Sequence, residues 1–163
     1  MIEKRIAVVD DDPFVVAHLK SALEHRIPDV DVVGIIEPVA PVGFDVYIVD
    51  KDFDGDNRGQ DVVNRIRSIS PQSLVLAYSA HLDREFLRGL LREGCEGAFD
   101  KGSLEELDSM ISIIESHFSS TGPQEFSIRG VGNTVRAISG LLREWNLRLD
   151  NGGRADAEIV SDA

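Results

Sequence analysis

Apolar runs and amphipathic segments alternate along the first 118 residues. Runs of consecutive apolar residues, rich in Val and Ile, predict buried strands over residues 5–10, 30–36, 46–50, 74–79 and 97–101. Apolar residues at helical spacing predict helices over residues 13–25, 60–69, 83–93 and 103–118. Because strands and helices alternate, we expect the α/β fold class, with a doubly wound, five-stranded parallel sheet covered on both faces.

One connection breaks this alternation. Residues 37–44 join the second and third predicted strands and contain two prolines, Pro38 and Pro41. A parallel crossover usually carries a helix and takes a dozen or more residues. This segment is too short and too rich in proline for a regular helix, so we expect the second helix to be short or missing.

The last two predicted helices of this region have further features. The apolar face of the last one predicts that Leu104 and Leu107 point toward the core. In the preceding helix, Arg84, Arg88 and Arg92 recur at every fourth position. This spacing predicts an exposed basic face, which is a candidate contact surface for a partner protein.

The chain changes character after residue 118, where Ser, Thr, Gly and Pro form a linker by composition. We expect a domain over residues 1–118, a linker over 119–130, a helical extension over 131–149 and a disordered tail over 150–163. The extension has an apolar seam at heptad spacing, formed by Val131, Val135, Ile138, Leu142, Trp145 and Leu149. It is open whether this helix packs back on its own domain, forms a homodimer or binds a partner, or binds DNA.

Charge and cysteine content narrow the function classes. The sequence holds 29 acidic residues against 17 Lys and Arg, a net charge of −12, so overall charge does not favour nucleic-acid binding. Cys95 is the only cysteine, which excludes an intrachain disulfide. No apolar run reaches the roughly 20 residues of a membrane span, and no signal peptide precedes Arg5. We therefore expect a cytoplasmic protein without membrane contact.

Polar side chains follow four of the five predicted strands: Asp10 and Asp11, then Asp50, Ser79 and Lys101. In open α/β sheets the carboxyl ends of the strands form the ligand-binding edge. Carboxylates gathered at such an edge repel each other unless a cation lies between them, and oxygen ligands suit Mg²⁺. With a lysine and a hydroxyl nearby, the edge can hold a phosphoryl group while an aspartate attacks it.

The order of these residues resembles the receiver domain of bacterial two-component response regulators. The resemblance covers about residues 3–118 and implies a flavodoxin-like sheet with strand order 2-1-3-4-5. It rests on four stretches, Val8 to Pro13, Val46 to Asp50, Ala77 to Ala80 and Gly94 to Lys101.

The resemblance implies roles for individual residues. Asp50 is similar to the phospho-acceptor, Ser79 to the switch hydroxyl, and Lys101 to the lysine that pairs with the phosphoryl group. The implied cofactor is Mg²⁺, and its implied ligands are Asp10, Asp11, Asp50 and the backbone carbonyl of Asp52.

The function implied by the resemblance is a phospho-acceptor switch in two-component signal transduction. The protein would receive its phosphoryl group from a histidine kinase or phosphotransfer protein, and it would not itself be an enzyme. It would act through protein–protein interaction or through a homodimer built on residues 131–149. One alternative is a transcription regulator, because residues 130–143 resemble part of a LuxR-type recognition helix, although DNA binding is not favoured. Another is a pseudo-receiver that works without phosphorylation.

Two positions depart from the family pattern near its last strand. Gly102 follows the lysine where the family usually has a proline. Ala98 occupies the place of the switch aromatic residue, and Phe99 is expected on the opposite face of the sheet. These departures put the usual signalling switch in doubt more than phosphorylation itself.

The segment after Asp50 admits two other interpretations. Its Asp-x-Asp-x-Asp-Gly pattern matches the start of a calcium-binding EF-hand loop, but that loop follows a helix, and here it follows an apolar strand. Asp50 and Asp52 also resemble the first motif of haloacid-dehalogenase-type phosphatases, whose acidic metal pair comes late in the chain instead of first. We expect residues 51–59 to form an acidic loop and to be the main difference from the family.

Overall fold

The computed structural model describes residues 4–92 and 95–119. Its strands are β1 (Lys4–Val9), β2 (Val30–Ile35), β3 (Val46–Val49), β4 (Asp52–Phe53), β5 (Asp56–Asn57), β6 (Leu74–Ser79) and β7 (Gly97–Asp100). Its helices are α1 (Pro13–Arg26), α2 (Gly59–Ile69), α3 (Arg84–Arg92) and α4 (Leu104–Ser119). Within these ranges no helix has the length and hydropathy to cross a membrane. Ser119 ends α4, and the rest of the predicted linker, the extension and the tail lie outside the described residues.

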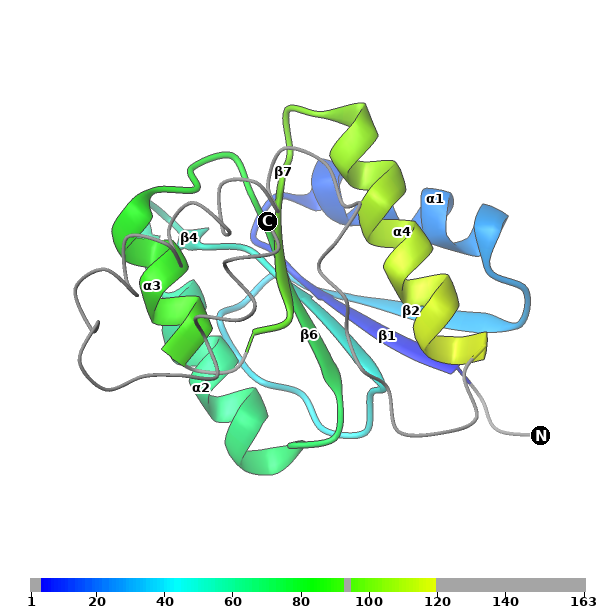
Figure 1. Ribbon diagram of the computed structural model, residues 1–163, viewed down its shortest axis with the longest axis horizontal. Helices are drawn as coiled ribbons and strands as arrows, with labels where there is room; N and C mark the ends of the chain where they lie inside the picture. Colours follow the sequence, from blue (N-terminus) through cyan, green and yellow to red (C-terminus); the bar gives the residue numbers. More distant parts are fainter. Residues whose placement is uncertain (1–3, 93–94, 120–163) are drawn as a thin grey trace, which may run out of the picture.

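Five parallel strands form the central sheet in the order β2-β1-β3-β6-β7. Because β4 and β5 pair separately, this is the predicted order 2-1-3-4-5, and the predicted fold class is confirmed. Helices α1 and α4 cover one face of the sheet, and α2 and α3 cover the other (Figure 1). Strand β3 is buried on both faces: Val46 and Ile48 pack on the α1 side, and Tyr47 and Val49 pack on the α2 side.

The connection between β2 and β3 contains no helix, as predicted. Phe44 at its end is buried on the α2 side, where its ring meets Tyr47 edge-on with centroids 5.8 Å apart. The Tyr47 hydroxyl donates a hydrogen bond to the carbonyl of Pro41 at 2.6 Å. A loop thus covers this part of the sheet, and it leaves three apolar side chains exposed, Ile36, Val39 and Val42.

The segment expected to be an acidic loop is a short hairpin instead. Strands β4 and β5 are antiparallel, with Phe53 opposite Asp56. Asp54 and Gly55 between them have φ angles of 52° and 84°. A type I′ turn requires positive φ at both central residues, and Asp-Gly is a preferred pair for it. Phe53 is 3% exposed and anchors the hairpin in the core on the α2 side.

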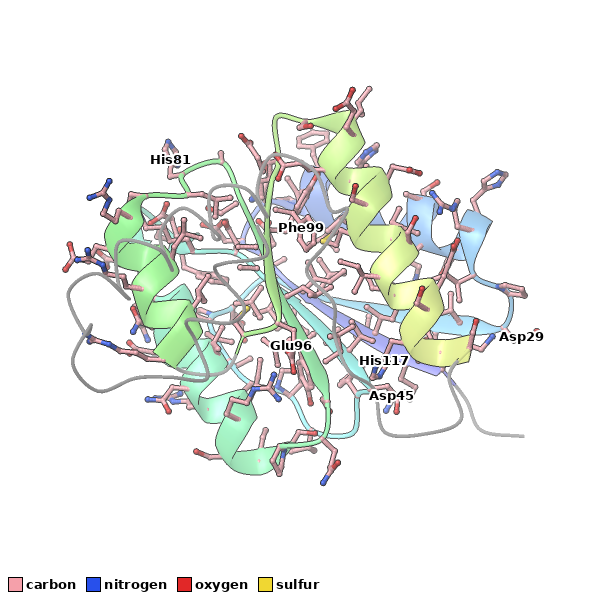
Figure 2. The ribbon with its side chains drawn as sticks, viewed as in Figure 1. Asp29, Asp45, His81, Glu96, Phe99 and His117 are labelled. Carbon is pink, nitrogen blue, oxygen red and sulfur yellow. The ribbon has the colours of Figure 1, made fainter. Side chains whose placement is uncertain are left out.

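Two predictions about side-chain direction near β7 have different outcomes. Phe99 is buried on the α4 side of the sheet (Figure 2), and Ala98 is buried on the α3 side, as expected. Leu107 is 7% exposed and joins the core as predicted, but Leu104 is 81% exposed and the prediction for it was wrong. Leu104 is the first residue of α4, at the end of β7 where the sheet stops (Figure 1).

Candidate functional site

Main-chain hydrogen bonds continue the parallel sheet beyond its strands and fix the first site residues. The amides of Asp10 and Asp50 donate to carbonyls of β2 and β1, each at 2.9 Å. The amide of Lys101 donates to the carbonyl of Ser79 at 3.1 Å. Because the strands are parallel, these four residues leave the sheet at the same edge, as the sequence predicted.

The ammonium group of Lys101 lies between two buried carboxylates. Its Nζ is 2.6 Å from Asp10 Oδ2 and 3.1 Å from Asp50 Oδ2. The side chains of Asp10 and Asp50 are only 3% and 8% exposed, so water screens these pairs weakly. Burial lowers the pKa of Lys101, but its hydrogen bonds and charge pairs with the two aspartates outweigh burial and raise that pKa above its usual value. Burial also raises the pKa of Asp10, although the hydrogen bond from Lys101 opposes this shift.

A third carboxylate completes an oxygen-rich cluster. Oxygens of Asp10, Asp11 and Asp50 lie within 4.8 Å of one another. The amide of Asp12 donates to Asp10 Oδ1 at 2.9 Å, and the amide of Lys51 donates to Asp50 Oδ1 at 2.7 Å. Carboxylate oxygens are the ligands that Mg²⁺ prefers, and Asp11 and Asp50 line an open cleft with room for water. The donor set therefore fits the predicted cation.

The β4–β5 hairpin and the start of α2 support this cluster. The amide of Asp54 donates to Asp11 Oδ2 at 2.7 Å. The amide of Gly59 donates to the carbonyl of Lys51 at 2.8 Å. A Cβ atom on Gly59 would lie 2.1 Å from the carbonyl oxygen of Asp50, so the helix can approach Asp50 this closely only with glycine at this position.

Ser79 lies in the same cleft as Asp50. It is 1% exposed as a whole residue and, together with Asp50 and Lys101, contributes to the lining of the cleft. Its hydroxyl oxygen accepts a hydrogen bond from the amide of His81 at 3.3 Å. Because a hydroxyl can accept and donate at once, the Ser79 proton can still be donated to a group in the cleft.

The structure adds three cleft residues that the sequence did not single out. Lys51 Nζ is 2.6 Å from Asp83 Oδ2, and this pair joins the segment after Asp50 to the residue before α3. The hydrogen bond and charge of Asp83 raise the pKa of Lys51. His81 Nδ1 is 3.6 Å from Asp52 Oδ2, and its ring points outward from the loop after β6 (Figure 2). The position of Lys51 next to Asp50 was a usable signal, whereas nothing in the sequence marks Asp83 or His81.

The three arginines of the predicted basic face on α3 differ in their exposure to solvent. Arg84 and Arg92 are exposed, whereas Arg88 is partly buried, with one guanidinium nitrogen covered. The predicted exposure is thus confirmed for Arg84 and Arg92 and holds only in part for Arg88.

Comparison with known proteins gives a consistent answer on the fold. No protein-family model and no curated protein matches the sequence. The BeF3-activated receiver domain of DrrB, an OmpR/PhoB homologue of Thermotoga maritima, matches with a TM-score of 0.62 at 17% identity, over 73% of this chain and 100% of its own. A CheY-like receiver domain protein from Methanospirillum hungatei matches with a TM-score of 0.62 at 17% identity, over 72% and 98%. The response regulator domain of Thermotoga maritima CheB matches with a TM-score of 0.60 at 20% identity, over 74% and 100%. The described part of this chain therefore has the receiver-domain fold of response regulators.

Proposed function

We propose that Asp50 accepts a phosphoryl group and that the protein is a phosphorylation-dependent switch of the two-component type. The observation that supports this most strongly is the surroundings of Asp50. A buried carboxylate lies 3.1 Å from the ammonium of Lys101, and two further carboxylates have oxygens within 4.8 Å. Lys101, together with a cation bound by the carboxylates, would neutralise a phosphoryl group and hold it against the Asp50 oxygen that attacks it.

The proposed reaction exchanges one bond to phosphorus for another. An oxygen of Asp50 bonds to phosphorus, the bond to the donor's nitrogen breaks, and the nitrogen keeps the electron pair. Lys101 would neutralise charge on the phosphoryl oxygens, and the Ser79 hydroxyl would donate a hydrogen bond to one of them. A bound Mg²⁺ would neutralise and orient the same oxygens, with the metal ligands proposed to be Asp10, Asp11, Asp50 and the main-chain carbonyl of Asp52.

The ion pair of Lys51 and Asp83 offers a route from the acceptor to the surface. Phosphorylation would replace the single negative charge of the Asp50 carboxylate by a phosphoryl group with close to two, beside Lys51, the next residue in the chain. Lys51 now pairs with Asp83 at a distance of 2.6 Å, directly before α3. Competition between the phosphoryl group and Asp83 for this ammonium would change how the start of α3 is held. We therefore propose that the output is a change in protein–protein contacts near α3. We also propose that a histidine kinase or phosphotransfer protein donates the phosphoryl group and that this protein has no catalytic activity of its own.

The test is chemical labelling of the full chain with a small phosphodonor in the presence of Mg²⁺. We expect acid-labile phosphate on the wild type, its loss in Asp50→Asn, and its loss when the metal is chelated. Asp61→Asn is the matched control, because Asp61 is an exposed acid on α2 and the substitution changes the charge equally. A wild type that stays unlabelled, or label that persists in Asp50→Asn, would contradict the proposal and favour a pseudo-receiver.

A further inference from the structure

We propose that residues 131–149 of the same chain form a helix that packs on the loop between β2 and β3, where the fold lacks its crossover helix. The surface in question is the loop patch, which we define as the side chains of Ile36, Val39 and Val42. The proposal is independent of phosphorylation at Asp50.

The three apolar side chains of the loop patch are all exposed. Ile36 is 57% exposed, Val39 is 40% exposed and Val42 is 72% exposed. They recur at every third position of one loop, and Phe44, near the end of the same loop, is buried on the α2 side of the sheet. Removal of apolar side chains from water is favourable, so a partner that covers the patch is favoured.

The topology shows what kind of element the patch lacks. The other three crossovers of the described sheet each carry a helix, α1, α2 or α3, that packs on the sheet. Only the connection from β2 to β3 crosses without one. At this edge of the sheet, Val33 and Ile35 of β2 are only partly buried against the α2-side core. A helix with one apolar stripe would restore the missing layer at this edge.

The chain carries a segment of the right kind. Residues 131–149 have an apolar seam of six residues at heptad spacing and would form a helix about 28 Å long at 1.5 Å per residue. The described part ends at Ser119, so residues 120–130 can span up to roughly 36–40 Å. A domain of this size has a radius of gyration of about 13 Å, so the segment can reach either face of it.

Charge favours docking on the domain over pairing of two such segments. Residues 131–149 contain three arginines and one glutamate, whereas the whole chain has a net charge of −12. Glu37 is exposed in the same loop and follows Ile36 in the chain. Two copies of the segment would bring like charges together, while the loop offers Glu37 to an arginine of the segment, although Arg5 also lies at this loop, over the Phe44 ring. The tether also gives the intramolecular contact an effective concentration in the range of mM.

Trp145 provides the readout, because it is the only tryptophan of the chain and belongs to the seam. The experiment measures emission and acrylamide quenching of Trp145 in the full chain, for the wild type, Val42→Glu and Leu104→Glu. Leu104→Glu is the matched control, since Leu104 is an 81% exposed apolar residue away from the loop patch. Circular dichroism confirms that each variant is folded.

We expect wild-type Trp145 to have blue-shifted emission and to be protected from acrylamide. Both properties should be lost in Val42→Glu, kept in Leu104→Glu, and unchanged on dilution. The proposal is overturned if wild-type Trp145 is quenched as readily as in denaturant, or if Val42→Glu leaves its protection intact. Protection that disappears on dilution, together with a dimer in sedimentation, would identify a second copy as the occupant and would also overturn it.

Discussion

Lys101 is the residue on which the electrostatics of the site depend. Its ammonium contacts Asp10 and Asp50 at 2.6 and 3.1 Å, in a part of the cleft where both carboxylates are nearly buried. Without this cation, two negative charges would lie close together with little water to screen them. The same position makes Lys101 available to a phosphoryl group on Asp50, so one residue serves both the stability of the unmodified protein and the proposed reaction.

Substitution of Lys101 by Met should therefore destabilise the protein. We expect a loss of about 3 kcal/mol in the free energy of unfolding, which is the lower end of the range for removing one partner of a buried ion pair. Mg²⁺ should restore part of this loss, because a divalent cation can take over the neutralisation of Asp10 and Asp50. Urea unfolding with MgCl₂ or with chelator measures both effects.

The control for this prediction is Lys20→Met, since Lys20 is half exposed and its 3.7 Å pair with Glu24 contributes little. The pKa of Lys101 is raised in the folded state, so its contribution is fully present below its ordinary value of 10.5. That contribution is lost as pH rises through the higher folded-state pKa. The difference between wild type and Lys101→Met should stay constant across neutral pH, and a difference that vanishes there would contradict this explanation.

At the scale of elements, the β4–β5 hairpin and α2 hold the acceptor strand in position. The hairpin donates the Asp54 amide to Asp11, and α2 begins at Gly59, whose amide donates to Lys51. The donor is a main-chain amide in both contacts; the Gly59 contact also has a main-chain acceptor, whereas the Asp54 contact needs the carboxylate of Asp11. At Gly59, the closeness of the Asp50 carbonyl leaves no space for a Cβ atom.

The substitution Gly59→Ala tests this close approach. An added Cβ would lie 2.1 Å from the Asp50 oxygen and 2.7 Å from Lys51 Cα, so either the helix or the acceptor must move. We expect a loss of about 1–3 kcal/mol in the free energy of unfolding, as for other overpacked positions, and weaker labelling of Asp50. Gly102→Ala is the control, because its Cβ would meet only a side-chain oxygen of Asp100, at 3.2 Å. Equal stability of Gly59→Ala and wild type in denaturant titrations would show that the approach is looser than described.

At the scale of the whole molecule, the effect of the overall acidic charge on stability must be distinguished from the effect of the proposed Mg²⁺ site. A net charge of −12 means that any salt reduces repulsion within the folded chain. A specific site behaves differently, because a cation that binds only the folded state stabilises it by about 2.7 kcal/mol at a hundredfold excess over its Kd. Comparison of MgCl₂ with NaCl at equal ionic strength distinguishes the two effects.

We expect MgCl₂ to raise the thermal midpoint of the wild type more than NaCl of the same ionic strength does. The excess should disappear in Asp11→Asn, which loses a carboxylate of the cluster, and persist in Asp61→Asn, which removes the same charge from an exposed site on α2. Thermal unfolding followed by circular dichroism is sufficient. An Asp11→Asn variant with the full Mg²⁺ response would exclude Asp11 as a metal ligand.

The sequence predicted the positions of the site residues best where these residues stand at the ends of strands. The apolar runs that end at Asp10, Asp50, Ser79 and near Lys101 are buried strands, and a parallel sheet must bring such ends to one edge. The prediction fails where a strand is too short for its alternation of apolar and polar residues to be recognised. Strands β4 and β5 have two residues each, so no alternation can reveal them, although the Asp54-Gly55 turn signal was there.

The sequence by itself determined the fold class, the missing crossover helix and the group of residues at the site, because hydrophobic periodicity and proline content act locally. Only the tertiary structure decided how that group is held. Asp54 reaches Asp11 across 43 positions of the chain, and Lys51 reaches Asp83 across 32. Contacts of this kind depend on the paths of two loops at once, and a loop path is set by the packing of the elements that it joins.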